Sequence, residues 1–430
     1  ILLGVNEIKV SDAPKGTVLV ARELTPSVTA GIVKENIAGI ITETGGTTSH
    51  SAILARALEI PAVLSVEGVA SSLKNGDTVV VDGSEGAVIV NPDDNTVAEY
   101  SKKRDAFLAE RKELENYRGR ETKSASGEVY ELFCNIGKPE DAVKAVDADG
   151  EGVGLFRTEF LFMDRTSIPT EDEQFEAYKK AALILTGKSL IIRTLDIGGD
   201  KDIPYLGLEK EENPFMGFRA IRYCLKNREL FKSQIKAILR ASAFGDIKIM
   251  FPLITTMDEL REGKKLVAEC KADLRNMGIN FNENIQVGVM VETASAAVIA
   301  DMLAKEADFF SIGTNDLTGY TMACDRGNND VSYLYSPLQP SVLRMIKRTI
   351  ECGVQNGISV GMCGEAAANK LMIPLLISFG LTEFSVSAPS VLNVRKIIST
   401  WTKEEADKVT AKVLEMSTQQ EIVEYLKSVV

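Results

Sequence analysis

The spacing of hydrophobic residues divides the chain into regions of different organisation. From residue 16 to about residue 90, short Val/Ile-rich runs alternate with helical patterns at 27–35 and 51–58. Glycine, aspartate and proline separate the runs, which lie at 17–21, 39–42, 78–82 and 87–90. We predict a compact α/β domain over residues 1–92.

A highly charged segment follows this domain. Its apolar residues are spaced as one face of a helix, at Val97, Tyr100, Phe107, Leu108, Leu114 and Tyr117. This spacing predicts a long connecting helix over 93–120, and we interpret the polar stretch 118–127 as a hinge. Residues 93–122 are therefore predicted to be a linker helix with a hinge.

Strand and helix patterns then alternate to the end of the chain. Eight apolar runs typical of strands lie at 130–135, 152–157, 190–194, 247–252, 285–292, 308–313, 358–363 and 383–386. Helical patterns lie between them, for example at 170–185, 214–241, 257–276 and 341–356. Eight repeats of strand and helix predict a (β/α)8 TIM barrel over residues 123–430. A doubly wound open sheet is the alternative, because length alone does not prove closure.

Composition and charge exclude several classes of partner. The chain has 430 residues, more than one ordinary core holds, and a formal net charge of −12 that opposes binding to nucleic acid or anionic membranes. No apolar run is long enough for a membrane span, so we expect no membrane insertion. The six cysteines lie far apart without a CxxC pair. This usage favours reduced thiols, and we predict a cytoplasmic protein.

The single histidine is the first candidate for chemistry. His50 follows a Gly-Gly-Thr-Thr-Ser turn at 45–49 and precedes a segment with helical spacing. An imidazole at a helix N-terminus sits in positive potential, which keeps one nitrogen unprotonated and free to act as a nucleophile. The same N–H groups would stabilise a phosphoryl group on that nitrogen. The alternative is a capping or surface histidine without chemistry.

Polar clusters follow several predicted strands at their C-terminal ends, which in a parallel barrel meet at one mouth. Arg157, Arg193 and Arg326 would bring three guanidinium groups there, which suits a substrate with phosphate and carboxylate groups. Glu292 and Asp316 follow neighbouring strands and offer two hard carboxylates for a magnesium ion. The plainer alternatives are surface ion pairs and solvated loop acids.

Three further residues are candidates at the same mouth. Asn315, beside Asp316, could donate to a phosphate oxygen. Cys363 ends its strand between glycines, where it is either a buried structural thiol or a group that delivers a proton to carbon. Arg219 is a weaker candidate for the anion site. From these residues we predict a barrel enzyme that handles an anionic metabolite.

Several segments resemble motifs of a known family. The run 45–53 (Gly-Gly-Thr-Thr-Ser-His-Ser-Ala-Ile) resembles the phosphohistidine segment of the phosphoenolpyruvate-utilising enzymes. Runs 154–160 (Gly-Leu-Phe-Arg-Thr-Glu-Phe) and 313–318 (Gly-Thr-Asn-Asp-Leu-Thr) resemble that family's barrel motifs. Runs 324–328 (Cys-Asp-Arg-Gly-Asn) and 361–365 (Gly-Met-Cys-Gly-Glu) are most similar to enzyme I of the bacterial sugar phosphotransferase system. The similarity covers nearly the whole chain.

The resemblance implies an activity. His50 would accept a phosphoryl group from phosphoenolpyruvate on Nε2, pyruvate would leave, and the group would pass to the phosphocarrier protein HPr in sugar uptake. Because nucleophile and substrate pocket lie on different domains, the first domain would swivel onto the barrel mouth. The implied roles are substrate binding for Arg157, Arg193, Asn315, Asp316 and Arg326, magnesium binding for Glu292 and Asp316, and protonation of the enolate by Cys363.

The resemblance also implies an assembly and marks departures from the family. Barrels of this family pair into homodimers. Enzyme I normally begins with an extra strand and a helical subdomain that docks HPr, and neither is recognised in this chain, which begins at Ile1. We therefore expect autophosphorylation but poor transfer to HPr. Thr47, Gly319 and the segment 366–369 depart from the usual residues, for which we expect altered affinity.

Two other interpretations remain open on the sequence. The chain could be a fragment of pyruvate phosphate dikinase or phosphoenolpyruvate synthase, although it has no phosphate-cradling glycine loop for ATP. It could also be a non-catalytic regulator that senses phosphoenolpyruvate. Retention of His50, both acids and Cys363 disfavours the regulator.

Overall fold

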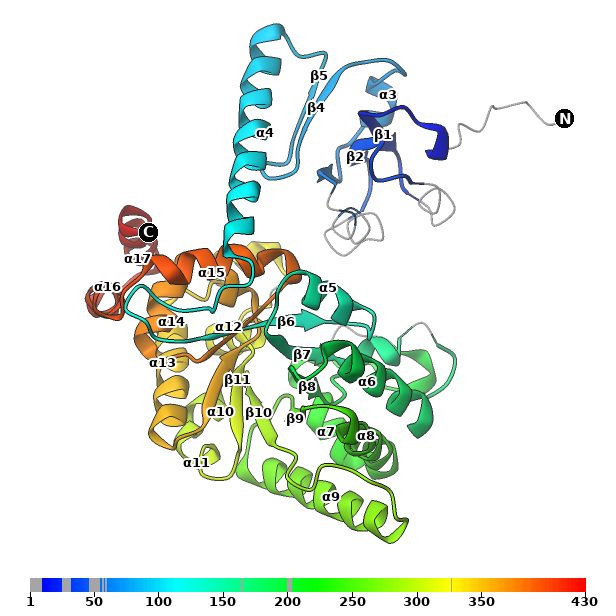
Figure 1. Ribbon diagram of the computed structural model, residues 1–430, viewed down its shortest axis with the longest axis vertical. Helices are drawn as coiled ribbons and strands as arrows, with labels where there is room; N and C mark the ends of the chain where they lie inside the picture. Colours follow the sequence, from blue (N-terminus) through cyan, green and yellow to red (C-terminus); the bar gives the residue numbers. More distant parts are fainter. Residues whose placement is uncertain are drawn as a thin grey trace, which may run out of the picture. The chain divides into compact units, whose positions relative to one another are not determined.

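The computed structural model contains two compact units, residues 1–113 and 114–430 (Figure 1). It describes residues 10–24, 32–45, 55, 58, 60–163, 165–198, 203–325 and 327–430. No helix in the described ranges combines the length and apolar character that a membrane crossing requires.

The first unit contains two small sheets. A parallel sheet has the order β1-β2-β3, and β4 and β5 form an antiparallel hairpin. The hairpin turn is stabilised by Asp82, whose Oδ1 accepts hydrogen bonds from the backbone N–H groups of Ser84 and Glu85. All four predicted strands of this region are confirmed. The strands are β1 Thr17–Ala21, β2 Ile37–Thr42, β3 Ala62–Val63, β4 Val79–Asp82 and β5 Ala87–Val90, with the 3-10 turn η1 Val10–Asp12 and the short helix α3 Val69–Ser72.

Of the two helical patterns predicted in this unit, the first is wrong at its C-terminal end and the second is helical at the two residues that the structure describes. Residues 27–31 lie outside the described residues, but 32–36 form coil and a turn, so the prediction of helix to residue 35 is wrong. Backbone bonds from Asn36 to Val33 and from Ile37 to Lys34 reverse the chain there and lead it into β2. In the second pattern, Ala55 and Leu58 are helical.

The predicted linker helix is present as α4, Asp94–Leu114, extended by the 3-10 turn η2 Glu115–Tyr117. Asp93 caps it by accepting a hydrogen bond from the backbone N–H of Thr96 at 2.7 Å. Its predicted apolar face is not buried: Phe107 is 58% exposed and Leu108 is 52% exposed. The helix therefore owes its continuity to its cap and its charged residues rather than to a packed face.

The stretch interpreted as a hinge is fastened to the second unit. Backbone N–H of Gly119 donates to Asp149 Oδ2 at 2.6 Å. Arg395, which is buried, donates to Tyr117 O at 3.1 Å and to Thr122 Oγ1 at 2.9 Å, and it pairs with Asp149. Residues 118–127 can act as a hinge only if such contacts break. The boundary between the units falls earlier, between residues 113 and 114.

The second unit is a closed barrel of eight parallel strands, so the open-sheet alternative is wrong. Each strand pairs with its neighbours in chain order, and β13 closes the barrel onto β6. All eight predicted strands are present. They are β6 Glu131–Ile136, β7 Gly152–Arg157, β8 Ser189–Arg193, β9 Ile247–Phe251, β10 Val287–Val291, β11 Phe309–Ile312, β12 Ser359–Met362 and β13 Glu383–Val386.

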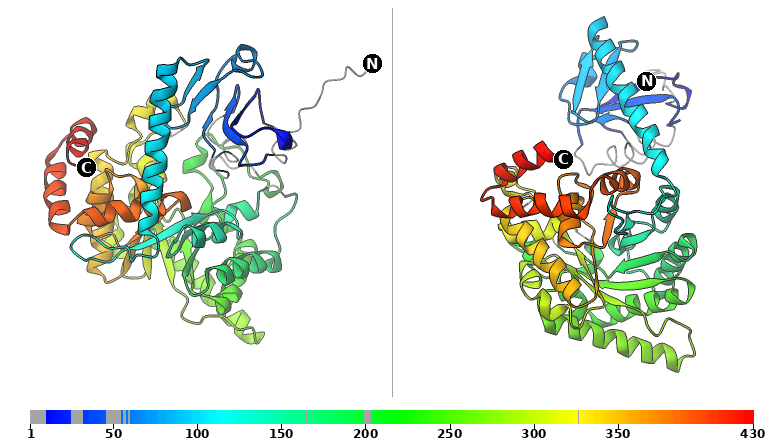
Figure 2. Two further views of the ribbon diagram at one scale, coloured as in Figure 1. Left: turned by 45° about the horizontal axis from the view of Figure 1, so that its top comes forward. Right: turned by 60° about the vertical axis from the view of Figure 1, so that its left-hand side comes forward.

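Helices surround the strands of this barrel (Figures 1 and 2). Capping boxes start α6, α9, α16 and α17, where a threonine side chain and a glutamate three residues later satisfy each other's backbone N–H groups. The helices are α5 Asp141–Asp147, α6 Glu171–Leu185, α7 Ala220–Lys226, α8 Arg228–Ala241, α9 Met257–Asn276, α10 Ala294–Val298, α11 Ala300–Leu303, α12 Thr314–Met322, α13 Pro340–Gln355, α14 Ile373–Phe379, α15 Val391–Thr400, α16 Lys403–Glu415 and α17 Gln419–Val429.

One predicted helix is wrong. The pattern at 214–241 is divided into the 3-10 turn η5 Pro214–Met216, then α7, then α8. Ala220 has a φ of 52°, a left-handed conformation that a helix cannot continue through, and Asn227 separates α7 from α8 with a ψ of 62°. Arg219 directly precedes this break, and its guanidinium contacts Asp196 and Asp316 beyond the C-terminal ends of β8 and β11.

The barrel interior is apolar at mid-height and polar toward its ends. Leu155, Ile191, Met250, Met290, Phe309 and Cys363 form one buried cluster inside the strands. At the N-terminal end, Glu383 begins β13 with only 6% of its surface exposed and with no hydrogen bond to Oε1 from any described residue. Gly154 and Gly361 make room for it: a Cβ at residue 154 would collide with Glu383 Oε1, and one at residue 361 would lie 2.9 Å from Glu383 Cδ. Burial raises the pKa of Glu383 to about 8, with the charge of Glu131 adding to the rise and Lys248 opposing it.

This carboxyl predicts a pH-dependent stability. The folded chain holds the Glu383 proton at pH values where the unfolded chain has lost it, so stability should fall as pH rises from about 5 to about 8, by ~1.4 kcal/mol per pH unit at most. Glu383→Gln has no proton to lose. Its melting temperature should match that of the unsubstituted chain near pH 5 and exceed it by several degrees near pH 8.

Thermal unfolding measured across this pH range tests the prediction. The exposed Glu424→Gln serves as the control and should follow the unsubstituted chain throughout. Parallel curves for Glu383→Gln and the unsubstituted chain would contradict it.

Candidate active site

Four of the predicted site residues lie at the C-terminal end of the barrel strands. Arg157 and Arg193 are the last residues of β7 and β8 and form a register pair of these neighbouring parallel strands. Glu292 directly follows β10, and Cys363 directly follows β12. Because the strands are parallel and the barrel is closed, these four positions share one mouth.

Helix α12 supplies two more predicted residues. It starts at Thr314 directly after β11, so that Asn315 and Asp316 lie in its first turn. Tyr335 Oη donates to the backbone carbonyl of Asn315 at 2.9 Å, which holds this turn in place. Gly313 precedes the helix, and a Cβ there would come within 2.7 Å of Glu292 Oε2. The absence of a side chain at residue 313 therefore lets the Glu292 carboxyl approach the start of α12.

A chain of ion pairs crosses the mouth. Arg193 Nη2 lies 2.8 Å from Glu159 Oε1 and 3.1 Å from Asp196 Oδ2. Arg219 Nη2 lies 2.9 Å from Asp196 Oδ1 and 3.1 Å from Asp316 Oδ2. Asp196 thus joins the two arginines, and each arginine contacts two carboxylates. Apart from Asp316, all of these side chains are almost fully buried, so their Coulomb interactions are weakly screened.

Sequence reasoning undervalued part of this network. Arg219 was only a weaker candidate, yet it contacts Asp196, Asp316 and Tyr320, whose Oη it approaches at 3.3 Å with Nη1. Glu159 and Asp196 were not assigned roles. Glu159 follows Arg157 by two residues, and Asp196 follows Arg193 by three. This spacing after arginines at strand ends could have indicated that both acids belong to the mouth. Tyr320 Oη also donates to Phe215 O, which ties the segment before α7 to α12.

Two charged residues at the mouth, Arg157 and Glu292, lie outside this chain of ion pairs. Arg157 is half-buried and forms no ion pair with any residue that the structure describes. Glu292 is buried, and its Oε1 accepts a hydrogen bond from the backbone N–H of Leu253 at 2.7 Å. Burial raises the pKa of Glu292, the neighbouring charges of Asp316 and Asp196 raise it further, and the buried arginines oppose the rise. The mouth therefore has a positive charge without a described carboxylate partner at Arg157, and several neighbouring negative charges around Glu292.

Cys363 is held through its backbone. Its N–H donates to Ile312 O at 3.1 Å, and its carbonyl accepts a hydrogen bond from Asn135 Nδ2 at 3.2 Å. Burial raises the pKa of the thiol to about 11; Ser311, Arg193 and Arg157 lower the pKa and Glu292 raises it. At neutral pH the sulfur therefore carries its proton, which a general acid requires.

Some predicted residues cannot be placed. His50, Thr47 and Arg326 lie outside the described residues, and their positions remain predictions. Within the described ranges, no group of three or more His, Cys, Asp or Glu side chains is arranged to hold a metal ion. The predicted metal ligands are two, Glu292 and Asp316, so a cation there would need oxygen atoms from substrate or water.

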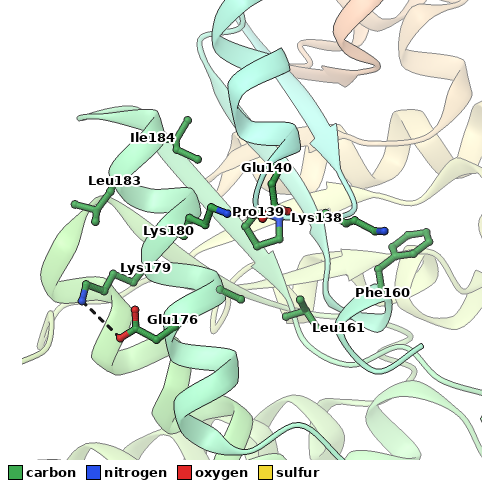
Figure 3. A pocket seen from close by; sticks show the side chains of 11 residues that line it. Lys138, Pro139, Glu140, Phe160, Leu161, Glu176, Lys179, Lys180, Leu183 and Ile184 are labelled. Carbon is green, nitrogen blue, oxygen red and sulfur yellow. Dashed lines mark hydrogen bonds and ion pairs between the residues drawn. The ribbon is translucent and has the colours of Figure 1, made fainter. Parts of the chain in front are cut away.

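A separate groove lies on the outside of the barrel and does not include these candidates. It runs between α6 and the loop after β6, where Figure 3 shows Lys138, Pro139, Phe160 and Leu183 around it. Its lysines are partly neutralised, for example Lys179 by Glu176 at 3.6 Å. None of the predicted site residues lines this groove.

Two family models match the chain. Residues 13–86 match the mobile domain of the PEP-utilising enzymes, and residues 111–402 match the PEP-binding domain of the same enzymes. The first match contains His50, and the second contains every predicted residue of the barrel mouth.

Curated relatives cover nearly the whole chain. It is 50% identical over 426 residues to the phosphoenolpyruvate-protein phosphotransferase of Bacillus subtilis, covering 99% of this chain and 75% of that protein. The proteins of the same name from Staphylococcus carnosus and Geobacillus stearothermophilus are 46% and 48% identical over 426 residues, covering 99% of this chain and 74% of each relative. The chain therefore belongs to the PEP-utilising enzymes and, within them, to the phosphoenolpyruvate-protein phosphotransferase family.

Proposed function

We propose that this chain transfers the phosphoryl group of phosphoenolpyruvate to His50 and releases pyruvate, and that HPr is the onward acceptor, to which this chain by itself transfers slowly. The observation that supports this most directly is the barrel mouth. It combines Arg157, which has no ion pair among the described residues, two arginines anchored by carboxylates, and two acids that directly follow or closely follow neighbouring strands. Phosphoryl transfer requires positioning and charge neutralisation, and these groups supply both.

The substrate's anionic groups would bind to the guanidinium side of the mouth. Arg157 has no competing ion pair among the described residues, so both faces of its fork are available to a carboxylate or phosphate. Arg193 Nε is buried without a hydrogen-bond partner there, and it offers a further donor beside Arg157. Asn315 in the first turn of α12 would donate to a phosphate oxygen, and Arg326 would add a fourth cation.

Magnesium fits the acidic side of the mouth. Glu292 and Asp316 stand near enough for the charge of one to raise the pKa of the other, and a divalent cation would relieve that repulsion. Gly313 leaves the space beside Glu292 Oε2 clear. We propose Glu292 and Asp316 as the magnesium ligands. When bound, the ion supplies charge neutralisation for the transferring phosphoryl group.

Cys363 would complete the reaction at carbon. When the phosphorus–oxygen bond of the substrate breaks toward a nitrogen of His50, pyruvate is left as its enolate. The enolate's terminal carbon takes the proton of the Cys363 thiol, and the electron pair of the S–H bond stays on sulfur. The raised pKa of the buried thiol keeps this proton in place until the enolate forms.

The nucleophile and the substrate residues belong to different compact units. The reaction therefore requires the unit that contains His50 to approach the barrel mouth and to leave again, with α4 as the connection. We further propose that the chain acts in the cytoplasm as a homodimer formed through the barrel. Membership of the phosphoenolpyruvate-protein phosphotransferase family favours phosphoryl transfer to a protein over the activity of a dikinase fragment or the role of a non-catalytic sensor.

Phosphorylation of His50 is the first prediction of this proposal. After incubation with phosphoenolpyruvate and magnesium, mass spectrometry should find one acid-labile phosphoryl group on the peptide that contains residue 50, together with an equal amount of pyruvate. His50→Ala should yield neither product. Label found at another residue, or label that requires ATP, would contradict the proposal.

Removal of the proposed proton donor is the second prediction. Cys363→Ala should slow pyruvate formation by roughly 100-fold or more, because general acid catalysis contributes about that factor. The phosphoenolpyruvate concentration for half-saturation should change little, because the thiol does not hold the substrate's anionic groups. A rapid-quench assay of a single turnover measures both quantities.

The control for this experiment is Cys270→Ala. Cys270 is also a buried thiol, but it lies in α9 with its Sγ 3.8 Å from Lys232 O. Its removal should leave the rate of pyruvate formation unchanged. Equal rates for Cys363→Ala and the unsubstituted chain would return Cys363 to a structural role.

A further inference from the structure

Ser311 in β11 carries a hydroxyl group inside the barrel that the packing does not explain. The residue is 1% exposed, and its Oγ forms no hydrogen bond with any described residue. It lies two residues after Phe309, which belongs to the interior cluster, and therefore faces the same interior. A buried hydroxyl without a partner lowers stability, so its presence calls for another explanation.

Register places this hydroxyl beneath Cys363. Ser311 pairs with Gly361 of the neighbouring strand, so no side chain of that partner covers the hydroxyl. Cys363 follows Gly361 by two residues and faces the same side. The Cys363 Sγ lies 3.7 Å from the carbonyl of Ile312, the residue next to Ser311. The Ser311 hydroxyl lowers the pKa of the Cys363 thiol, against the effect of burial.

The backbone of Cys363 is fixed from its other side. Asn135 Nδ2 donates to the carbonyls of Cys363 and Ser385, at 3.2 Å each. Ser385 Oγ donates to Asn135 Oδ1 at 2.7 Å, which leaves the amide oriented in one way. The peptide of Cys363 is thus tied to β6, β11 and β13, and its sulfur stays above Ser311.

We propose that Ser311 is a positioning residue whose hydroxyl donates a hydrogen bond to Cys363 Sγ as the thiol gives up its proton. This inference rests on the proposed role of Cys363 as the proton donor. The S–H bond breaks, a C–H bond forms on the enolate carbon, and the negative charge passes to sulfur. The serine proton is only shared with the sulfur and remains bonded to Oγ.

The timing of this hydrogen bond matters for catalysis. A hydroxyl hydrogen rotates freely about its C–O bond, so Ser311 can turn its proton toward sulfur when the charge appears. The bond is strongest when sulfur is negative, which means that it favours the product side of proton transfer over the resting thiol. Ser311 should therefore influence the rate at saturation and not the binding of substrate.

Ser311→Ala tests the inference. The substitution should lower the saturating rate of pyruvate formation by roughly tenfold to hundredfold, the value of one hydrogen bond to a charged group, with half-saturation unchanged. Its melting temperature should stay the same or rise, because an unpartnered hydroxyl is replaced by an apolar group. Ser311→Thr retains the hydroxyl and should restore most of the rate.

Two controls separate this role from packing. Ser242→Ala removes a buried serine hydroxyl that donates to Leu239 O at 2.6 Å and accepts from the backbone N–H of Asn282 at 2.8 Å. It should lower the melting temperature but leave the saturating rate unchanged, the reverse of Ser311→Ala. The rate at which iodoacetamide alkylates Cys363 at a fixed pH, followed by peptide mass spectrometry, should fall in Ser311→Ala and not in Ser242→Ala.

The outcomes distinguish this inference from the proposed function. If Cys363→Ala is slow and Ser311→Ala keeps the unsubstituted rate, only the role of Ser311 is overturned. The same holds if Ser311→Ala is slow but threonine does not restore the rate and alkylation of Cys363 is unchanged. If Cys363→Ala itself turns over normally, the proposed proton donor fails and this inference fails with it.

Discussion

The barrel mouth depends on one buried chain of charges, from Glu159 through Arg193, Asp196 and Arg219 to Asp316. Removing these groups from water is costly, and the cost is offset only because every arginine contacts two carboxylates at hydrogen-bond distance. Any change that removes one member leaves an uncompensated charge on its neighbour. The chain therefore holds its side chains rigidly before a substrate arrives, which is what charge stabilisation in a transition state requires.

What this network leaves unpaired defines the chemistry. Arg157 stands beside Arg193 in register but has no carboxylate of its own among the described residues. Glu292 is an acid with too little nearby positive charge: burial raises its pKa, and the neighbouring acids Asp316 and Asp196 raise it further. An anion at the first position and a divalent cation at the second would each complete an incomplete pairing. A phosphorylated carboxylic acid with magnesium, as we propose, would satisfy both at once.

Polar groups inside the barrel have different consequences for stability and function. Glu383 and Ser311 are both buried, and neither Glu383 Oε1 nor Ser311 Oγ has a hydrogen-bond partner among the described residues. Both pair in register with Gly361, and the carboxyl of Glu383 fills the space beside this glycine. The burial of Glu383 makes stability depend on pH. Ser311 lies two residues before Cys363 in register, so if Cys363 is the proton donor that we propose, the stability cost of the buried Ser311 hydroxyl would be retained for catalysis.

Local pattern determined the number, order and approximate bounds of the barrel strands, because a buried parallel strand needs a short apolar run whatever its neighbours are. It also identified Arg157, Arg193, Glu292 and Cys363 at strand ends. Spacing along the chain was less informative for 214–241, where the left-handed conformation of Ala220 breaks the helix, and for α4, whose apolar face is exposed. Only the tertiary structure decided that Asp196 joins Arg193 to Arg219 and that Ser311 lies beneath Cys363, because barrel closure and strand register set those distances and neither is encoded in local periodicity.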